Sequence, residues 1–161
     1  MKGLISVFSL GFLAVFATGC SDSMPAEYKN ALESGTDFVF LSVHPERKDP
    51  ATISAGKNFH NFEILGQKAV TDAATRRKLV AAFQKGVSES DGTVAACFNP
   101  RHGISVKQNG KTYDFVICFQ CLSASVYVDG VRGEGLLTTG SPAREFNEVI
   151  ADLGLPPAPG P

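Results

Sequence analysis

The chain has 161 residues, of which 43% are hydrophobic and 19% are charged, and its formal net charge is −1. This composition is typical of one compact domain and excludes a disordered or collagen-like chain. A domain of this length buries about two thirds of the surface of its unfolded chain, so a sizeable core is expected. The near-neutral charge, with a pI near 6.3, argues against a nucleic-acid partner, which would require a strongly basic face.

The first twenty residues predict an export signal. Lys2 is followed by an uncharged apolar run over residues 4–16. This run is shorter than the roughly 20 residues of a membrane-spanning helix and matches the hydrophobic region of a signal peptide. Small residues follow at 17–19, directly before Cys20, and small residues at this point suit a signal peptidase.

This arrangement resembles the lipobox of bacterial lipoproteins, although Ala17 stands where that family usually has Leu. The resemblance implies that residues 1–19 are removed, that Cys20 carries acyl chains such as palmitate, and that a lipid bilayer is the partner. Because Ser21 rather than Asp follows the cysteine, it also implies the periplasmic face of the outer membrane in a Gram-negative host. The other reading is a secreted protein whose Cys20 lies near the cleavage site by chance.

The first elements of the mature chain are predicted from its apolar pattern. Residues 20–35 are expected to form the lipidated cysteine and a tether, with one short helical turn over 25–33. Residues 37–43 predict a strand ended by Pro45, and residues 59–65 predict a second strand. A helix is predicted from Thr71 or Asp72 to about Lys85, ended by Gly86.

The second half predicts a hairpin between two further strands and a last helix. Residues 93–98 predict a third strand, 103–107 and 112–119 flank the turn sequence Asn109-Gly110, and 123–128 precede Asp129-Gly130. Residues 142–153 predict a helix capped by Ser141 and ended by Gly154. Residues 36–154 are thus expected to form a single α+β domain, an antiparallel sheet of about five strands with two helices packed on one face. Residues 155–161 predict a Pro-rich tail.

Three cysteines and one histidine form the only group of residues with distinctive chemistry. Cys97 and His102 precede the predicted hairpin, and Cys118 and Cys121 follow it. With Asn109-Gly110 as the loop, His102 faces Ile117, so the two halves of the group meet at one end of the hairpin. Because Cys20 is assigned to lipid, an odd number of cysteines remains, and at least one is free, intermolecular or a ligand.

These four residues, Cys97, His102, Cys118 and Cys121, form a Cys/His corner for which three roles stay open. The first is a zinc or copper site made by Cys97, His102, Cys118 and Cys121. It requires the strand to break near Cys118, because Cys118 and Cys121 otherwise point to opposite faces. Metal-binding CxxC pairs are also often followed by Gly, whereas this chain has Leu122.

The second role is structural, through buried thiols or a disulfide of Cys97 with Cys118 or Cys121, since the periplasm is oxidising. His102 would then fix the turn after Pro100. The third role is a thiol oxidoreductase that uses Cys118 and Cys121, although Cys118 ends a strand rather than beginning a helix.

The sequence CFNPRHGI followed by VICFQC resembles a motif of exported or lipid-anchored bacterial proteins with no assigned activity. Its pattern is approximately C-[FY]-x-P-R-H-[AG]-[IL], then a strand with ICFxC. The resemblance covers residues 97–121 and implies that Pro100, Arg101, His102 and the cysteines belong to one unit. Arg101 could bind an anion, but pairing with a carboxylate such as Asp114 is the simpler expectation.

The remaining candidates are weaker. His60 is expected at the core or rim, on one strand face with Phe62 and Ile64, and His44 is expected in a solvated turn. The sequence contains no serine nucleophile elbow, HExxH or paired-carboxylate motif. We therefore expect a membrane-anchored periplasmic lipoprotein with a structural Cys/His corner. The alternatives are metal binding and, third, thiol oxidoreductase activity.

Overall fold

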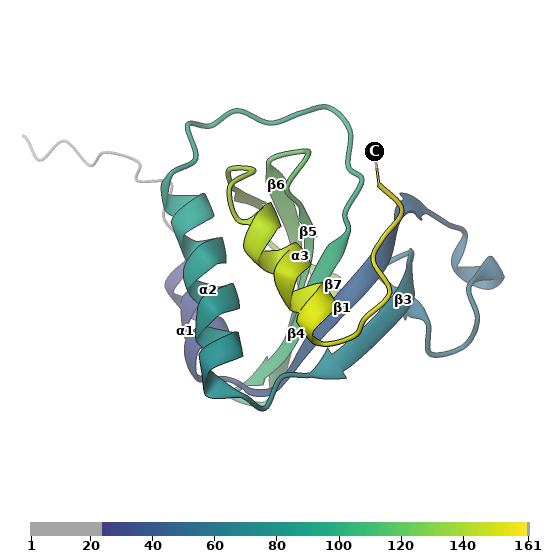
Figure 1. Cartoon of the computed structure of the whole chain (residues 1–161), viewed down its shortest axis with the longest axis horizontal. Coiled ribbons are helices and arrows are strands. Elements are labelled where there is room, and N and C mark those ends of the chain that lie inside the picture. Colours follow the sequence, from purple (N-terminus) through teal and green to yellow (C-terminus); the bar gives the residue numbers. More distant parts are fainter. Residues whose placement is uncertain (1–23, 161) are drawn as a thin grey trace, which may run out of the picture.

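The computed structural model describes residues 24–160, in which three α-helices pack against an antiparallel sheet (Figure 1). The predicted signal peptide (1–19) and Cys20 lie outside the described residues. The helices are α1 (Ala26–Ser34), α2 (Ala73–Ser88) and α3 (Ala143–Asp152), together with a short 3-10 turn, η1 (Pro50–Thr52). The strands are β1 (Thr36–Arg47), β2 (Asn58–Phe59), β3 (Phe62–Ala69), β4 (His102–Gln108), β5 (Lys111–Cys118), β6 (Ser123–Val128), β7 (Val131–Arg132) and β8 (Leu136–Leu137).

The sheet has eight strands in the described part of the chain, in the order β2-β3-β1-β4-β5-β6-β7, with β8 paired to β6. The α+β class and the antiparallel sheet are confirmed. The expected five strands and two helices were too few, because the short helical turn predicted over 25–33 is a third helix, α1, and the structure adds three two-residue strands, β2, β7 and β8. Two residues are too short for an alternating pattern to reveal a strand.

The hairpin at the centre of the sheet is confirmed residue by residue. Asn109 and Gly110 both have positive φ, 52° and 76°, which is the backbone that a two-residue turn between twisted strands requires. The resulting register pairs His102 with Ile117 and Val106 with Tyr113. The second predicted turn, Asp129-Gly130, joins β6 to β7 in the same way.

The strand predicted over residues 59–65 is correct only from Phe62 onward, because the chain reverses before that residue. His60 and Asn61 have φ of 54° and 72° and form the turn between β2 and β3. Asn58 Oδ1 accepts the N–H of Asn61 at 2.8 Å, a local bond that favours a turn over a strand. His60 therefore does not lie on a strand face with Phe62 and Ile64.

The strand predicted over residues 93–98 is also wrong. This segment belongs to an irregular loop that leads from α2 to β4. Both edges of β4 are occupied by β1 and β5, so the segment has no free edge of β4 on which to pair. The predicted end of the first strand at Pro45 is wrong as well. β1 continues to Arg47, and a register shift between Val43 and Arg47 accommodates the proline.

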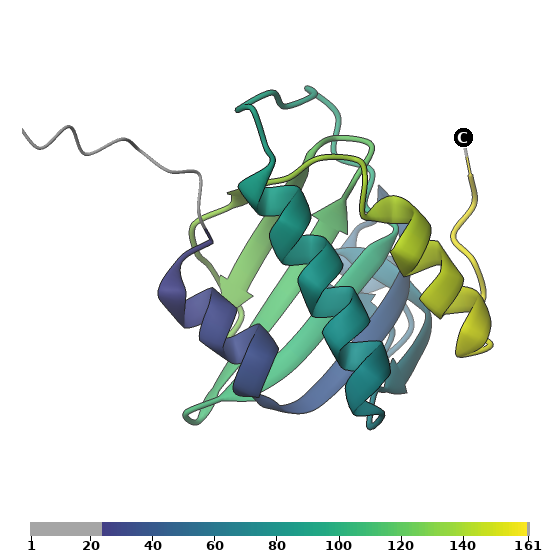
Figure 2. The same cartoon turned by 60° about the vertical axis from the view of Figure 1, so that its left-hand side comes forward.

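All three helices cover one face of the sheet (Figure 2). Asp72 caps α2 by accepting the N–H of Thr75 at 2.7 Å, as predicted. Gly86 does not end α2 but lies inside it, where a Cβ would approach Thr138 Oγ1 to 2.5 Å and Pro142 Cγ to 2.6 Å. Among residues 24–160, none of the helices combines the length and the hydropathy of a membrane-spanning segment.

The segment predicted as a tether belongs to the folded domain from Met24 onward. α1 buries Tyr28, Ala31 and Leu32 in the main core. Arg76 of α2 reinforces this packing, because its guanidinium donates to the carbonyl oxygens of Leu32 and Gly35. The helix-covered core also contains alternate residues of β1, β4, β5 and β6, including Phe40, Ile104, Phe115 and Val126.

The opposite face of the sheet carries a smaller core. It consists of buried residues from β1, β2, β3 and β5, namely Leu41, Val43, Phe59, Phe62, Ile64 and Val116. Phe98, from the loop that precedes β4, packs against this cluster. The same loop therefore reaches the second core and carries Cys97.

The Pro-rich tail packs on the domain instead of extending from it. In Figure 1 it runs from the end of α3 past β1 and β3. A Cβ on Gly66 of β3 would lie 2.6 Å from Pro156 Cδ, and Arg101 Nε donates to Pro159 O at 3.1 Å. The tail thus covers β3 and meets the residues at the start of β4.

Candidate functional site

The three cysteines of the domain gather where β5 ends. β5 stops at Cys118, and residues 119–122 turn back into β6. This turn gives Cys118 and Cys121 a Cα–Cα distance of 5.2 Å, and the two residues form a disulfide. The strand break required by the sequence argument is therefore present, but the predicted pairing of Cys97 with one of these residues is wrong.

Leu122 completes this turn in an unusual backbone conformation. Its φ of 56° lies in the left-handed region that favours glycine. The absence of Gly at this position was an argument against a metal-binding CxxC pair. The chain makes the turn regardless, and the disulfide and the bond from Thr138 N–H to Leu122 O at 3.0 Å hold it.

Cys97 is the free and exposed cysteine of the described domain. Its Sγ lies 3.6 Å from Sγ of Cys121. The loop is fixed at this point, because Ala95 N–H donates to Cys121 O at 3.2 Å and Asn99 N–H donates to Cys121 Sγ at 3.2 Å. Three sulfurs therefore lie together, two in a disulfide and one as a thiol.

His102, the fourth residue of the Cys/His corner, lies at the start of β4 and is only 4% exposed. Its ring stacks on Phe40 and contacts Phe119 and Phe146. Nε2 lies 2.9 Å from Asn147 Oδ1 of α3, and an amide oxygen only accepts, so the ring proton is on Nε2. The pKa of His102 is lowered to about 4, mainly because the side chain is buried; the bond to Asn147 opposes this shift and the charge of Arg101 adds to it. The imidazole is therefore neutral at neutral pH.

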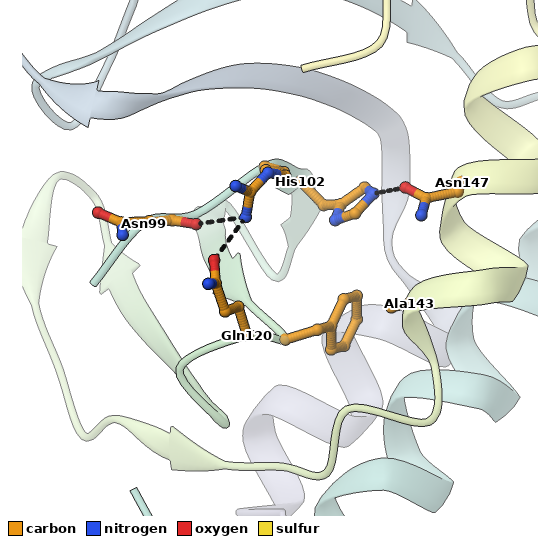
Figure 3. Close-up of a pocket in the computed structure, with 7 residues that line it drawn as sticks. Asn99, His102, Gln120, Ala143 and Asn147 are labelled. Carbon is orange, nitrogen blue, oxygen red and sulfur yellow. Dashed lines mark hydrogen bonds between the residues drawn. The ribbon is translucent and has the colours of Figure 1, made fainter. Parts of the chain in front are cut away.

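A cavity of about 250 Å³ opens in front of this histidine (Figure 3). Its walls come from the start of β4, the turn after β5 and the first turns of α3. The lining residues are Asn99, Arg101, His102, Phe119, Gln120, Ala143 and Asn147. A second cavity of about 330 Å³ lies between His102 and the C-terminal tail, and Ser42, whose buried Oγ has no hydrogen-bond partner within residues 24–160, lines it.

Arg101 acts as a brace between these segments. Its Nη1 donates to Gln120 Oε1 at 3.0 Å and to Asn99 O at 3.5 Å, and these are the dashed bonds at the labelled Gln120 and Asn99 in Figure 3. Its Nε donates to Pro159 O. The predicted pairing with Asp114 is wrong. Arg101 precedes His102 and therefore aligns near Cys118, four residues from Asp114, or about 13 Å along a strand. Its predicted role in binding an anion remains a prediction.

Asp114 instead pairs with His60, a contact that the sequence analysis missed. His60 Nε2 lies 2.8 Å from Asp114 Oδ2, and the imidazole stacks on Tyr127 at 3.7 Å. The register could have placed Asp114 beside Tyr127, but the misassigned strand over 59–65 hid the turn that carries His60. His44, predicted in a solvated turn, lies in β1, where its Nδ1 accepts the N–H of Glu46 at 3.2 Å.

The four predicted metal ligands lie in one region but are not arranged around a common point. Cys118 and Cys121 are joined, and His102 Nε2 is bonded to Asn147. Over residues 24–160, no group of three or more His, Cys, Asp or Glu side chains is placed to hold a metal ion. A zinc or copper site of these residues would first require reduction of the disulfide, since thiolates are the ligands.

The chain matches no family model, no curated protein and no solved structure. The resemblances to the lipobox and to the CFNPRHGI and VICFQC motif remain predictions. The function is therefore inferred from the sequence itself and from the geometry of the Cys/His corner.

Proposed function

We propose that this chain is the precursor of a lipid-anchored envelope lipoprotein, acylated at Cys20, whose Cys/His corner is a structural unit closed by a disulfide. The observation that carries the proposal is the Cys118–Cys121 disulfide in a chain that begins with a signal-like segment. Disulfides form and persist in exported proteins and are rare in the cytosol. The anchor and the disulfide therefore point to the same oxidising compartment.

The corner has the contacts of a structural brace. The disulfide fixes the turn that carries Gln120, Gln120 holds Arg101, and Arg101 holds the C-terminal tail. His102 is buried among aromatic rings, and its Nε2 forms a hydrogen bond with Asn147. These contacts join the sheet, α3, the loop before β4 and the tail, and they support a role in holding a surface for interaction in the envelope.

The short connection to Cys20 places the domain close to the membrane in this proposal. Five residues separate Cys20 from Ala26, the first residue of α1. Extended chain covers at most about 3.5 Å per residue, so the connection spans less than about 25 Å. We propose the periplasmic face of the outer membrane as the location.

Acylation is tested by expressing the full chain in a Gram-negative host supplied with an alkyne analogue of palmitate. We expect label on the wild-type chain and on Cys97→Ala, and none on Cys20→Ala. We also expect Ser21→Asp to move the labelled protein from the outer to the inner membrane fraction. An unlabelled wild-type chain would overturn the lipid anchor.

The structural role is tested by metal analysis and thiol titration of the same purified protein. One alkylated cysteine in the domain, one disulfide and no bound metal are expected. Stoichiometric zinc or copper with three protected thiols would overturn the structural reading and favour the metal-binding alternative.

A further inference from the structure

The disulfide is out of reach of the solvent, whereas the third cysteine is not. Cys118 and Cys121 are 1% and 0% exposed, so a thiol in solution has no direct approach to either sulfur. Cys97 is exposed, and its Sγ lies 3.6 Å from Cys121 Sγ. This is contact distance between two sulfur atoms, one of which is the sulfur that a thiolate would attack.

The position of Cys97 is built by its neighbours rather than left to a free loop. Backbone bonds from Ala95 and Asn99 to Cys121 hold the chain on both sides of it. Arg101 N–H adds a bond to Ile117 O at 3.3 Å. Because the loop is fixed at residues 95, 99 and 101, the thiol of Cys97 stays against Cys121 in the folded domain.

The leaving sulfur in such an attack, Cys118 Sγ, also receives a hydrogen bond that stabilises it. Cys118 Sγ accepts the N–H of Cys121 at 3.1 Å. A hydrogen bond donated to sulfur favours the thiolate over the thiol. Disulfide exchange is faster when the leaving thiolate is stabilised, so this bond assists cleavage between Cys118 and Cys121.

We propose that Cys97 is the gateway thiol through which an external dithiol exchanges with the buried Cys118–Cys121 disulfide. In the first step the Cys97 thiolate attacks Cys121 Sγ. The Cys97–Cys121 bond forms, the Cys118–Cys121 bond breaks, and its electron pair goes to Cys118. Cys118 takes up one proton, Cys97 has released one to water, and no net oxidation occurs.

The second step involves the external dithiol, which is a small molecule or is carried by a protein. One of its thiolates attacks the exposed Cys97 Sγ, forms a mixed disulfide and releases Cys121 as a thiolate. Its second thiol then displaces Cys97 and closes a disulfide within the dithiol. The domain has gained two electrons and two protons as two thiols, and the dithiol has lost the same number.

This inference rests on the proposed disulfide, and its test is the rate of reduction by dithiothreitol. The mature full-length protein in detergent is mixed with the reductant, quenched with acid, alkylated and mapped by mass spectrometry. We expect Cys97→Ala to lose the disulfide at least about ten times more slowly than the wild type, because the relay is removed. Val94→Ala, in the same loop and exposed, is the matched control and is expected to react at the wild-type rate.

Equal or faster reduction of Cys97→Ala would overturn the proposal. A second variant, Cys118→Ala, is oxidised with diamide and mapped, and we expect a Cys97–Cys121 disulfide. Free thiols at both positions would also overturn the proposal. A wild-type protein that lacks the Cys118–Cys121 peptide before reduction would instead overturn the structural disulfide, so the two failures are distinguishable.

Discussion

His102 is a titratable residue that the fold buries in an apolar environment. Three phenylalanine rings surround it, and its Nε2 has a single partner, Asn147. The sequence predicted a structural histidine near Pro100 as one reading, but it could not show the aromatic cage. Phe40, Phe119 and Phe146 come from β1, the turn after β5 and α3, and only the tertiary fold brings them together.

This burial predicts that acid destabilises the protein through His102. The folded pKa is about 4 against 6.5 for the free residue, so the unfolded chain binds the extra proton between these values. The contribution of neutral His102 to the free energy of unfolding is present above pH 6.5 and falls by up to about 1.4 kcal/mol per pH unit as the pH drops toward 4. Urea denaturation from pH 7 to pH 4.5 measures this slope.

The matched variants are His102→Phe, which keeps an aromatic ring without a proton to gain, and His44→Gln, which changes a histidine outside the core. We expect His102→Phe to lose part of the acid sensitivity and His44→Gln to retain it. An unchanged slope in His102→Phe would contradict the neutral buried imidazole.

Local sequence signals were sufficient to predict the central hairpin, but not every strand or the cysteine pairing. Asn109-Gly110 fixed the turn type, and the turn type fixed the register of β4 and β5. The strand predicted over residues 93–98 failed because β propensity does not reveal whether a sheet edge is free. The cysteine pairing failed because it depends on a turn at residues 119–122, and Leu122 carries no turn signal.

Substitution of Gly86 tests the contact between α2 and the segment that leads into α3. In an open helix, alanine is favoured over glycine by about 1 kcal/mol. Here a Cβ would meet Thr138 and Pro142 at about 2.5 Å, and overpacking costs about 1–3 kcal/mol. We expect Gly86→Ala to lower the free energy of unfolding, measured in urea, and Ser88→Ala on the same helix to leave it nearly unchanged. A stabilised Gly86→Ala would contradict this packing.

Substitution of Gly66 tests the packing of the C-terminal tail on β3. We expect Gly66→Ala to destabilise the full chain by about 1 kcal/mol, because the added methyl displaces Pro156. The methyl would also lie 3.2 Å from Leu155 Cδ2, so the same substitution is expected to be nearly neutral in a chain that ends at Gly154 and lacks both neighbours. Equal losses in urea denaturation of the two chains would mean that Gly66 and the tail act independently.

At the scale of the whole molecule, the sequence predicted the class of the fold but not its full extent. The apolar pattern indicated one face covered by helices, and the structure has that face. It also has a second core on the other face, and both the N-terminal helical segment, predicted as part of a tether, and the C-terminal tail are packed on the domain. These three depend on contacts between segments far apart in the chain, and local periodicity carries no information about them.

The corner joins these parts, since the loop that carries Cys97 also places Phe98 against the second core and Arg101 against the tail. The most direct test of the account is a non-reducing peptide map of the mature protein, quenched with acid and alkylated as it is isolated from the envelope. We expect Cys118 and Cys121 in one disulfide-linked peptide and Cys97 alkylated. Alkylation of all three cysteines of the domain would contradict the account.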